Sequence, residues 1–191
     1  PEKICDAAMK VEHSAQESHF DLPIFDPPVL LSAFDGQPAP IDSNAIDEGI
    51  ALHALLERLT HSRAWPIQVP DADLIARWLS CQATLAMAMR EQALQILSQV
   101  ELERFYNPQI YRAAYNEMEV ICAEGVFRID RLVVLDDAIW ILDYKRNVLA
   151  LELTAYRAQL HRYRLAVSAL YEGKKIQTAL ITSDGQLIEL N

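Results

Sequence analysis

Two acidic residues and a lysine lie inside segments that otherwise have the pattern of apolar strands. Asp130 occurs in GVFRIDRLVVL, and Asp143 and Lys145 occur in AIWILDYK. A charge removed from water is costly unless it is paired or binds a cation. Carboxylates on neighbouring strands offer the oxygen ligands that Mg²⁺ prefers, and a lysine beside them can stabilise charge on a phosphate. This combination predicts metal-assisted phosphodiester hydrolysis. The alternative is a buried Asp–Lys ion pair without a catalytic role.

Side-chain alternation along a strand decides which of these groups can meet. Asp143 and Lys145 are two residues apart and therefore share one face of a sheet, while Tyr144 points to the other. A D-x-K pattern by itself is common. The stronger signal is the pair Asp130-Arg131 in one apolar strand followed by D-Y-K in the next.

The elements that must position these residues can be read from hydrophobic periodicity. Helices are expected where apolar residues recur at helical spacing, and strands where they alternate or run continuously. The expected helices cover about 43–61, 71–88, 89–104 and 152–172, and the sequence leaves open whether the 84–91 region breaks or continues the helix. The expected strands cover about 116–124, 124–136, 138–145, 175–182 and 186–190. This order predicts an α/β fold with a mixed sheet, in which the first three strands form an antiparallel meander and the helix over 152–172 allows a parallel pairing.

The remaining sequence bounds the class of protein. Residues 1–44 are irregular and rich in proline, so they are expected to form an arm or linker. The chain begins at Pro1 and shows no signal peptide or membrane-length apolar run, which suggests a piece of a longer, cytoplasmic protein. Its three cysteines form no C-x-x-C pair, so a zinc ribbon or iron–sulfur cluster is not expected. The net charge of −10 argues against a basic nucleic-acid-binding module.

Four separated motifs carry a resemblance to a known family. GVFRIDRL followed by WILDYK resembles the PD-(D/E)XK nuclease superfamily. More narrowly, it resembles the RecB-type nuclease domain at the C-terminus of UvrD-family helicases such as AddA and RecB. The helix EGIALHALLERL places Gly49, His53 and Glu57 at the family's spacing, and YRAQLHRY matches its later Y-x-x-Q-L-x-x-Y helix. The resemblance covers about residues 45–190 and implies a restriction-endonuclease-like core of order αβββαβ over residues 45–191.

The resemblance also implies a metal site. Asp130 and Asp143 would be the carboxylate ligands of Mg²⁺, with Mn²⁺ as an alternative, His53 would contribute from its helix, and the carbonyl of Tyr144 would complete the shell. Lys145 would be the catalytic lysine. A single histidine on an apolar helix is more often a core residue than a ligand, so the expectation for His53 depends on the acids around it.

Four further residues are implied as accessory groups. Gln159 and Tyr163, one helical turn apart, would face the cleft together with Tyr156 and hold the nucleic-acid backbone or a metal-bound water. Core packing explains the two tyrosines nearly as well. Glu117 matches an acid that precedes the Asp130 strand and would be an accessory ligand.

The implied function is that of a Mg²⁺-dependent deoxyribonuclease, an exonuclease domain of a helicase–nuclease that acts in double-strand break processing and recombinational repair. Its partners would be DNA, in single-stranded form, the parent helicase domains of the same polypeptide, and a second helicase–nuclease subunit. No membrane partner is expected. Two alternatives remain open: a catalytically inactive nuclease-like fold for DNA binding or scaffolding, and a stand-alone endonuclease. Arg146 and Asn147 depart from the small and polar residues that often follow D-Y-K in the family.

Overall fold

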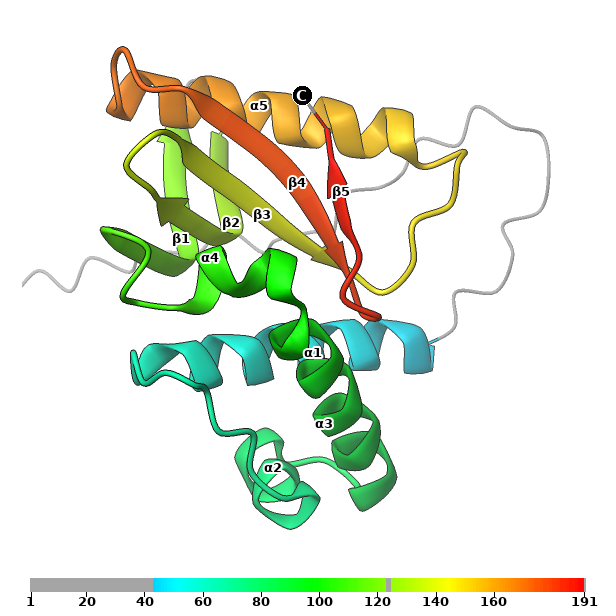
Figure 1. Ribbon diagram of the computed structural model, residues 1–191. Coiled ribbons are helices and arrows are strands. Elements are labelled where there is room, and N and C mark those ends of the chain that lie inside the picture. The colour runs from blue at the N-terminus through cyan, green and yellow to red at the C-terminus, as the bar shows by residue number, and fades with distance from the viewer. Residues whose placement is uncertain (1–42, 123–124, 191) are drawn as a thin grey trace, which may run out of the picture. The chain divides into compact units, whose positions relative to one another are not determined.

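A computed structural model of the protein describes residues 43–122 and 125–190, which form a five-stranded sheet with helices on both faces (Figure 1). An arm was predicted over residues 1–44, and its residues 1–42 lie outside the described part of the chain. No helix among the described residues has the length and apolar character needed to cross a bilayer.

The helices precede the sheet, apart from one long crossover helix. The first group comprises α1 (Ser43–His61), α2 (Ala72–Leu79), α3 (Ala83–Ser98), the 3₁₀ turn η1 (Val100–Leu102) and α4 (Glu103–Tyr106). The crossover helix α5 (Leu153–Leu170) joins the third strand to the fourth. The strands are β1 (Ala113–Cys122), β2 (Gly125–Val134), β3 (Ile139–Lys145), β4 (Ile176–Thr182) and β5 (Leu187–Glu189).

The sheet has the strand order β1-β2-β3-β4-β5. β1, β2 and β3 pair antiparallel, β3 and β4 pair parallel, and β5 returns antiparallel to β4. The crossover through α5 makes the parallel pair feasible, since parallel neighbours require a long connection. The predicted mixed sheet, the meander and the turn at Asp136-Asp137 are confirmed.

Two apolar cores cover the two faces of the sheet. α5 crosses one face, and α1, α3 and α4 lie on the other (Figure 1). Under α5, Leu160 and Val167 pack with Ile141 of β3. On the other face, Leu55 of α1 and Trp140 of β3 belong to the larger cluster. β3 is therefore buried on both faces, as its continuous apolar run predicts.

Two predicted helix boundaries are wrong. A helix from about 71 to 88 was expected, but α2 ends at Leu79, and α3 runs from Ala83 without a break through the 84–91 region, where a break or a continuation had been left open. The next helix was expected to reach about 104, but α3 ends at Ser98 and the short elements η1 and α4 follow. Asp71 caps α2 by accepting a hydrogen bond from Leu74 N at 2.9 Å. Ser80 then takes a left-handed conformation with φ of 52°, which ends the helix as a glycine often does. Because Ser80 is not a glycine or proline, the sequence carried no clear stop signal there.

Candidate metal centre

Strand β2 changes face at Asp130. Ile129 and Leu132 are three residues apart, yet both pack under α5, whereas a regular strand would place them on opposite faces. The same change occurs in β1, where Ala114 packs on the α1 side and Val120 packs under α5, although six residues separate them. The local distortion of both strands therefore occurs at the same level of the sheet.

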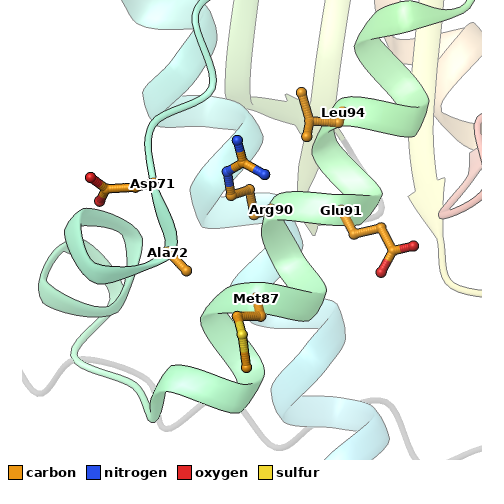
Figure 2. A pocket seen from close by; sticks show the side chains of 6 residues that line it. All are labelled: Asp71, Ala72, Met87, Arg90, Glu91 and Leu94. Atoms are coloured by element: carbon orange, nitrogen blue, oxygen red, sulfur yellow. The ribbon is translucent and has the colours of Figure 1, made fainter.

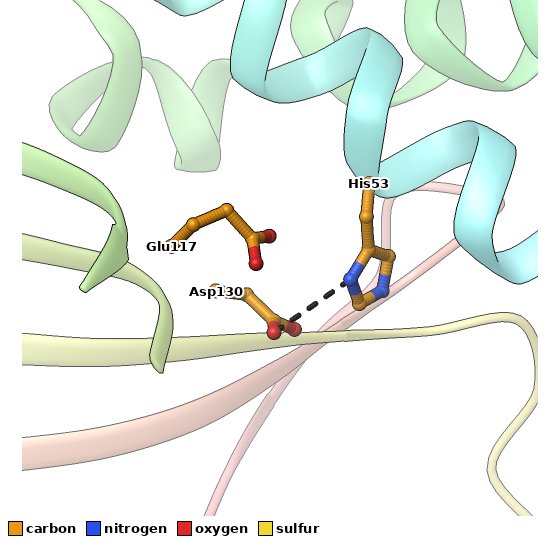
Figure 3. Close-up of side chains that lie close together, drawn as sticks. All are labelled: His53, Glu117 and Asp130. Carbon is orange, nitrogen blue, oxygen red and sulfur yellow. Dashed lines mark ion pairs between the residues drawn. The ribbon is translucent and has the colours of Figure 1, made fainter. Parts of the chain in front are cut away.

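Glu117 marks this distortion in β1. Its φ is 47°, a left-handed value that is unusual for a residue with a side chain. Main-chain pairing holds at Asn116–Arg131 and at Met118–Ile129, which leaves Glu117 opposite Asp130 with no ladder pair between them. Such irregularities often re-aim side chains beside functional sites. Here the result is that two carboxylates converge below α1 (Figure 3).

Asp130 also marks the point at which β2 and β3 separate. Their ladder ends at Arg131–Leu142, and the next residues along are Asp130 and Asp143. Beyond that point, Tyr144 N donates to the side-chain oxygen Oδ2 of Asp130 at 2.8 Å. The Asp130 carboxylate thus takes the place of a main-chain acceptor and is fixed in position.

His53 approaches the same carboxylate from α1 (Figure 3). Its Nε2 lies 3.2 Å from the carbonyl oxygen of Tyr144, and its Nδ1 lies 3.6 Å from Asp130 Oδ1. A carbonyl only accepts, so the hydrogen bond places the proton on Nε2, and the lone pair of Nδ1 in the neutral ring then faces Asp130. Two acceptors that face one another leave room for a proton or a cation between them.

The electrostatics of this group favour uptake of positive charge. Burial raises the pKa of Asp130 well above its usual value of 3.8, and the neighbouring Asp143 raises it further. Burial also lowers the pKa of His53, an effect that the hydrogen bond to Tyr144 and the nearby acids only partly offset. A neutral imidazole beside a carboxyl group that ionises reluctantly is a site that a divalent cation would stabilise.

Asp143 and Lys145 form an ion pair on the α5 face of β3. Lys145 Nζ lies 2.6 Å from Asp143 Oδ2, and it also lies 5.2 Å from the centre of the Tyr156 ring. Burial opposes the charge on Lys145, but attraction to Asp143 outweighs it, so the pKa of the lysine is raised. The predicted shared face of these two residues is confirmed, and the lysine carries its proton at neutral pH.

Gln159 of α5 holds the other oxygen of Asp143. Its Nε2 lies 3.3 Å from Asp143 Oδ1 and 2.8 Å from the hydroxyl oxygen of Tyr163. Tyr163 is itself buried and lies against Phe127, with ring centres 5.8 Å apart. The structure thus brings Gln159 and Tyr163 to the acid, and it leaves Tyr156 beside the lysine.

Comparison with known families identifies the fold. The family model described as the PD-(D/E)XK nuclease superfamily matches residues 31–188. The chain belongs to the PD-(D/E)XK nuclease superfamily. The mixed sheet flanked by helices agrees with its restriction-endonuclease-like core, as predicted. The matching model covers the superfamily as a whole, so assignment to the RecB-type branch stays a prediction. No curated protein matches the chain significantly.

The residues of this PD-(D/E)XK domain fit a hard divalent cation. His53, Glu117 and Asp130 each offer a ligand atom, and these atoms all lie within 4.8 Å of one another. Asp143 is almost fully buried, and its Oδ2 has no donor besides Lys145 among the described residues. Carboxylate oxygens with one imidazole nitrogen suit Mg²⁺ or Mn²⁺. Glu117 was expected only as an accessory ligand, but it belongs to the same group of three as His53 and Asp130. The carbonyl of Tyr144, expected to complete the metal's ligands, accepts a hydrogen bond from His53.

Arg131 follows Asp130 in β2 and has a structural role that its sequence position did not indicate. Arg131 is 1% exposed and donates to Asn116 Oδ1 and, through two nitrogens at 3.1 and 2.8 Å, to the carbonyl of Phe105. Asn116 in turn donates to Thr60 Oγ1 of α1 at 2.8 Å. We call Arg131 and Asn116 the Arg131 clasp. It ties α1, α4, β1 and β2 together next to Glu117 and Asp130.

A hollow between two of the helices lies apart from these residues. A pocket of about 410 Å³ between α2 and α3 is lined by residues that include Arg90 and Glu91, and Arg90 Nε donates to the carbonyl of Pro70 at 2.9 Å (Figure 2). None of the candidate site residues lines it. The candidate site residues thus lie on the sheet, α1 and α5, away from this pocket.

Proposed function

We propose that this PD-(D/E)XK domain is a divalent-metal-dependent deoxyribonuclease that hydrolyses phosphodiester bonds. The observation that carries the proposal is the convergence of His53, Glu117 and Asp130 on one point, with Asp143 and Lys145 on the adjacent strand. Asp143 pairs with Lys145 and Glu117 pairs with Arg128, but Asp130 has no lysine or arginine partner among the described residues. A buried carboxyl group of this kind is a cost to the fold, and a functional site explains why it is kept.

His53, Glu117 and Asp130 would hold the cation, and Asp143 would join them through its buried oxygen. The cation supplies Lewis acidity toward a phosphate oxygen and activates water at neutral pH. His53 is held in the required tautomer by Tyr144, and Asp130 is held by the amide of Tyr144. These contacts keep the ligands in place before a cation arrives, as second-shell contacts do in metal sites.

Lys145 would act as a donor and not as a base. Its raised pKa means that it enters the reaction protonated, so it cannot accept a proton from water. Its ammonium group would orient the attacking water and stabilise negative charge on the phosphate. Asp143 and Gln159 fix the position of this ammonium and of the acid beside it.

The finer parts of the proposal concern context. The four motifs that resemble RecB-type domains support an exonuclease that receives single-stranded DNA from helicase domains of the same polypeptide and acts in double-strand break repair, with Mg²⁺ as the working ion. A stand-alone nuclease would use the same residues. A stand-alone nuclease degrades free DNA by itself, whereas a helicase-associated nuclease requires the helicase domains to supply the strand.

The test uses single-stranded DNA labelled at its 5′ or 3′ end, incubated with the purified protein in Mg²⁺, Mn²⁺ or EDTA. The site variant is Asp143→Asn, and the matched control is Asp136→Asn, which changes an exposed acid in the β2–β3 turn. We expect metal-dependent cleavage that Asp143→Asn abolishes and Asp136→Asn retains. Equal cleavage by both variants, or cleavage in EDTA, contradicts the proposal. Shortening of the DNA from one labelled end supports the exonuclease, and internal cuts support an endonuclease.

A further inference from the structure

Helix α5 differs in charge from the rest of the chain. The chain has 27 acidic residues and 17 lysines and arginines, for a net charge of −10. The 18 residues of α5 include no Asp or Glu, but they include three arginines and a histidine: Arg157, His161, Arg162 and Arg164. Positive charge is therefore concentrated on one helix of an acidic protein.

These four residues lie on the outer side of α5. Its inner side is buried against the sheet through residues such as Leu160 and Val167. Arg157, His161 and Arg164 are spaced four and three residues apart, so they form a row along the helix. Arg164 Nη2 lies 3.0 Å from His161 Nδ1, which agrees with this arrangement. We call the four residues the α5 basic face.

Arg162 stacks on a ring of β2, the strand that carries Asp130. Its guanidinium group lies 5.6 Å from the centre of the Phe127 ring, and Phe127 also packs against Tyr163. It follows Gln159, which contacts Asp143, by three residues on the same helix. An arginine stacked on a ring loses less freedom when it binds a ligand than a freely moving one does.

We propose that the α5 basic face binds the backbone of the nucleic-acid strand whose scissile phosphate lies at the metal centre. This inference rests on the proposed nuclease function. A strand with a phosphate near Lys145 would continue across the helix that carries Gln159, where exposed guanidinium groups meet its next phosphates. Binding to the phosphates of a nucleic-acid backbone requires concentrated positive charge. Near α5 this positive charge offsets the repulsion between the phosphates and the net negative charge of the chain.

An anionic membrane is the competing partner for a basic helix. A helix that binds a lipid surface presents an apolar face to the acyl chains. The apolar side of α5 is already packed on the sheet, and its exposed large apolar residues are Leu165 at 56% and Leu170 at 58% exposure. These two are five residues apart and therefore do not form one apolar face. The described structure therefore favours a nucleic-acid strand over a membrane.

The test measures affinity for a fluorescent single-stranded DNA by anisotropy over a range of salt concentrations, in EDTA so that no cleavage occurs. The variant is Arg157→Ala/Arg162→Ala, in which alanine preserves helix propensity. The control is Arg77→Ala, an exposed arginine on α2. Each phosphate contact on a single strand contributes about 0.7 to the slope of log K against log salt, so we expect the double variant to reduce the slope by about 1.4. At moderate salt we expect roughly tenfold weaker binding, and Arg77→Ala should match the wild type.

Cleavage assays in Mg²⁺ separate this inference from the nuclease proposal. A rise in KM of about tenfold for the double variant, with the same shift in binding, supports both. Cleavage by the wild type with unchanged slope and KM in the double variant overturns the α5 inference alone. If the wild type binds DNA through these arginines but cleaves none, DNA binding by the α5 basic face is supported, while the nuclease proposal and the placement of a scissile phosphate at the metal centre fail. If the same arginines bind phosphatidylglycerol vesicles but not DNA, the α5 inference is overturned and a membrane is the partner.

Discussion

The side chain of Asp130 accepts a hydrogen bond from the main-chain nitrogen of Tyr144, with a distance of 2.8 Å between Oδ2 and N. This contact lies just past the last ladder pair between β2 and β3, so the Asp130 carboxylate takes the place of a main-chain acceptor. Asp130 is therefore both a hydrogen-bond acceptor that stabilises the sheet and a candidate metal ligand. Substitutions can separate these two roles.

Asp130→Asn and Asp130→Ala should differ in stability but not in metal binding. The asparagine keeps an oxygen that can accept from Tyr144 N, whereas alanine leaves that amide unpaired, at a cost of about 1–3 kcal/mol. Neither variant offers a carboxylate to a cation. Urea unfolding in EDTA should therefore rank Asp130→Asn above Asp130→Ala, while added Mn²⁺ stabilises neither. Equal stability of the two variants would show that the hydrogen bond contributes little.

The stability of the metal-free protein should fall as pH rises above about 4. The pKa of Asp130 is raised in the folded state, so between the unfolded value of 3.8 and that raised value the folded state binds a proton that the unfolded state does not. Stability then decreases with pH across this window. His53, whose pKa is lowered, acts in the opposite direction and adds stability as pH rises toward 6.5.

Thermal melts at several pH values in EDTA, for the wild type and Asp130→Asn, isolate the contribution of Asp130. The variant should lack the decline that begins above about pH 4, and Mg²⁺ should raise the Tm of the wild type more at pH 8 than at pH 5. If the Tm of the two proteins varies with pH in the same way, ionisation of Asp130 does not destabilise the folded state.

Lys145→Met should impair chemistry more than metal binding. The substitution removes the ammonium group beside Asp143 but leaves every candidate ligand in place. The loss of one charge-stabilising donor typically lowers kcat by about 10²–10³-fold. Calorimetric titration with Mn²⁺ should give an affinity equal to or tighter than that of the wild type, because a positive charge has been removed. Lys174→Met, an exposed change after α5, is the control. Weakened Mn²⁺ binding with normal turnover would reverse the roles assigned here.

The Arg131 clasp should support metal affinity from outside the site. Asn116→Ala removes the bridge between Arg131 and Thr60, next to Glu117. Changes in groups that hold metal ligands typically weaken affinity about 10–100-fold. A control of comparable stability is Ile75→Val in the buried core of α2, which should cost about 1 kcal/mol. If both variants lose stability and both bind Mn²⁺ like the wild type, the clasp is only a structural contact.

Much of this architecture could be predicted from local sequence patterns. Alternation and apolar runs located the strands, and the D-x-K spacing placed Asp143 and Lys145 on one face, because a strand has a period of two. The distortion at Glu117 and Asp130 could not be predicted in this way. A regular period predicts opposite faces for Asp130 and Arg131, whereas the structure brings Asp130 to His53 and Arg131 to Asn116, both on the α1 side.

The remaining differences have similar causes. The break at Ser80 depends on a left-handed conformation that serine adopts infrequently, so local sequence gives little sign of it. The clasp depends on a carbonyl of Phe105 from a distant short helix, and nothing in the spacing of Asn116 and Arg131 indicates that contact. The charge of α5, by contrast, can be counted from the sequence, but its position beside Asp143 follows only from the fold.

The central claim is that His53, Glu117 and Asp130 hold the divalent cation on which cleavage depends. Anomalous diffraction from crystals of the wild-type protein grown with Mn²⁺ tests it most directly. We predict a manganese peak in contact with His53 Nδ1 and the carboxylates of Glu117 and Asp130, with metal–oxygen distances of about 2.0–2.3 Å. The peak should be absent in Asp130→Asn. A manganese peak elsewhere, or none here at Mn²⁺ concentrations that support DNA cleavage in solution, would contradict the account.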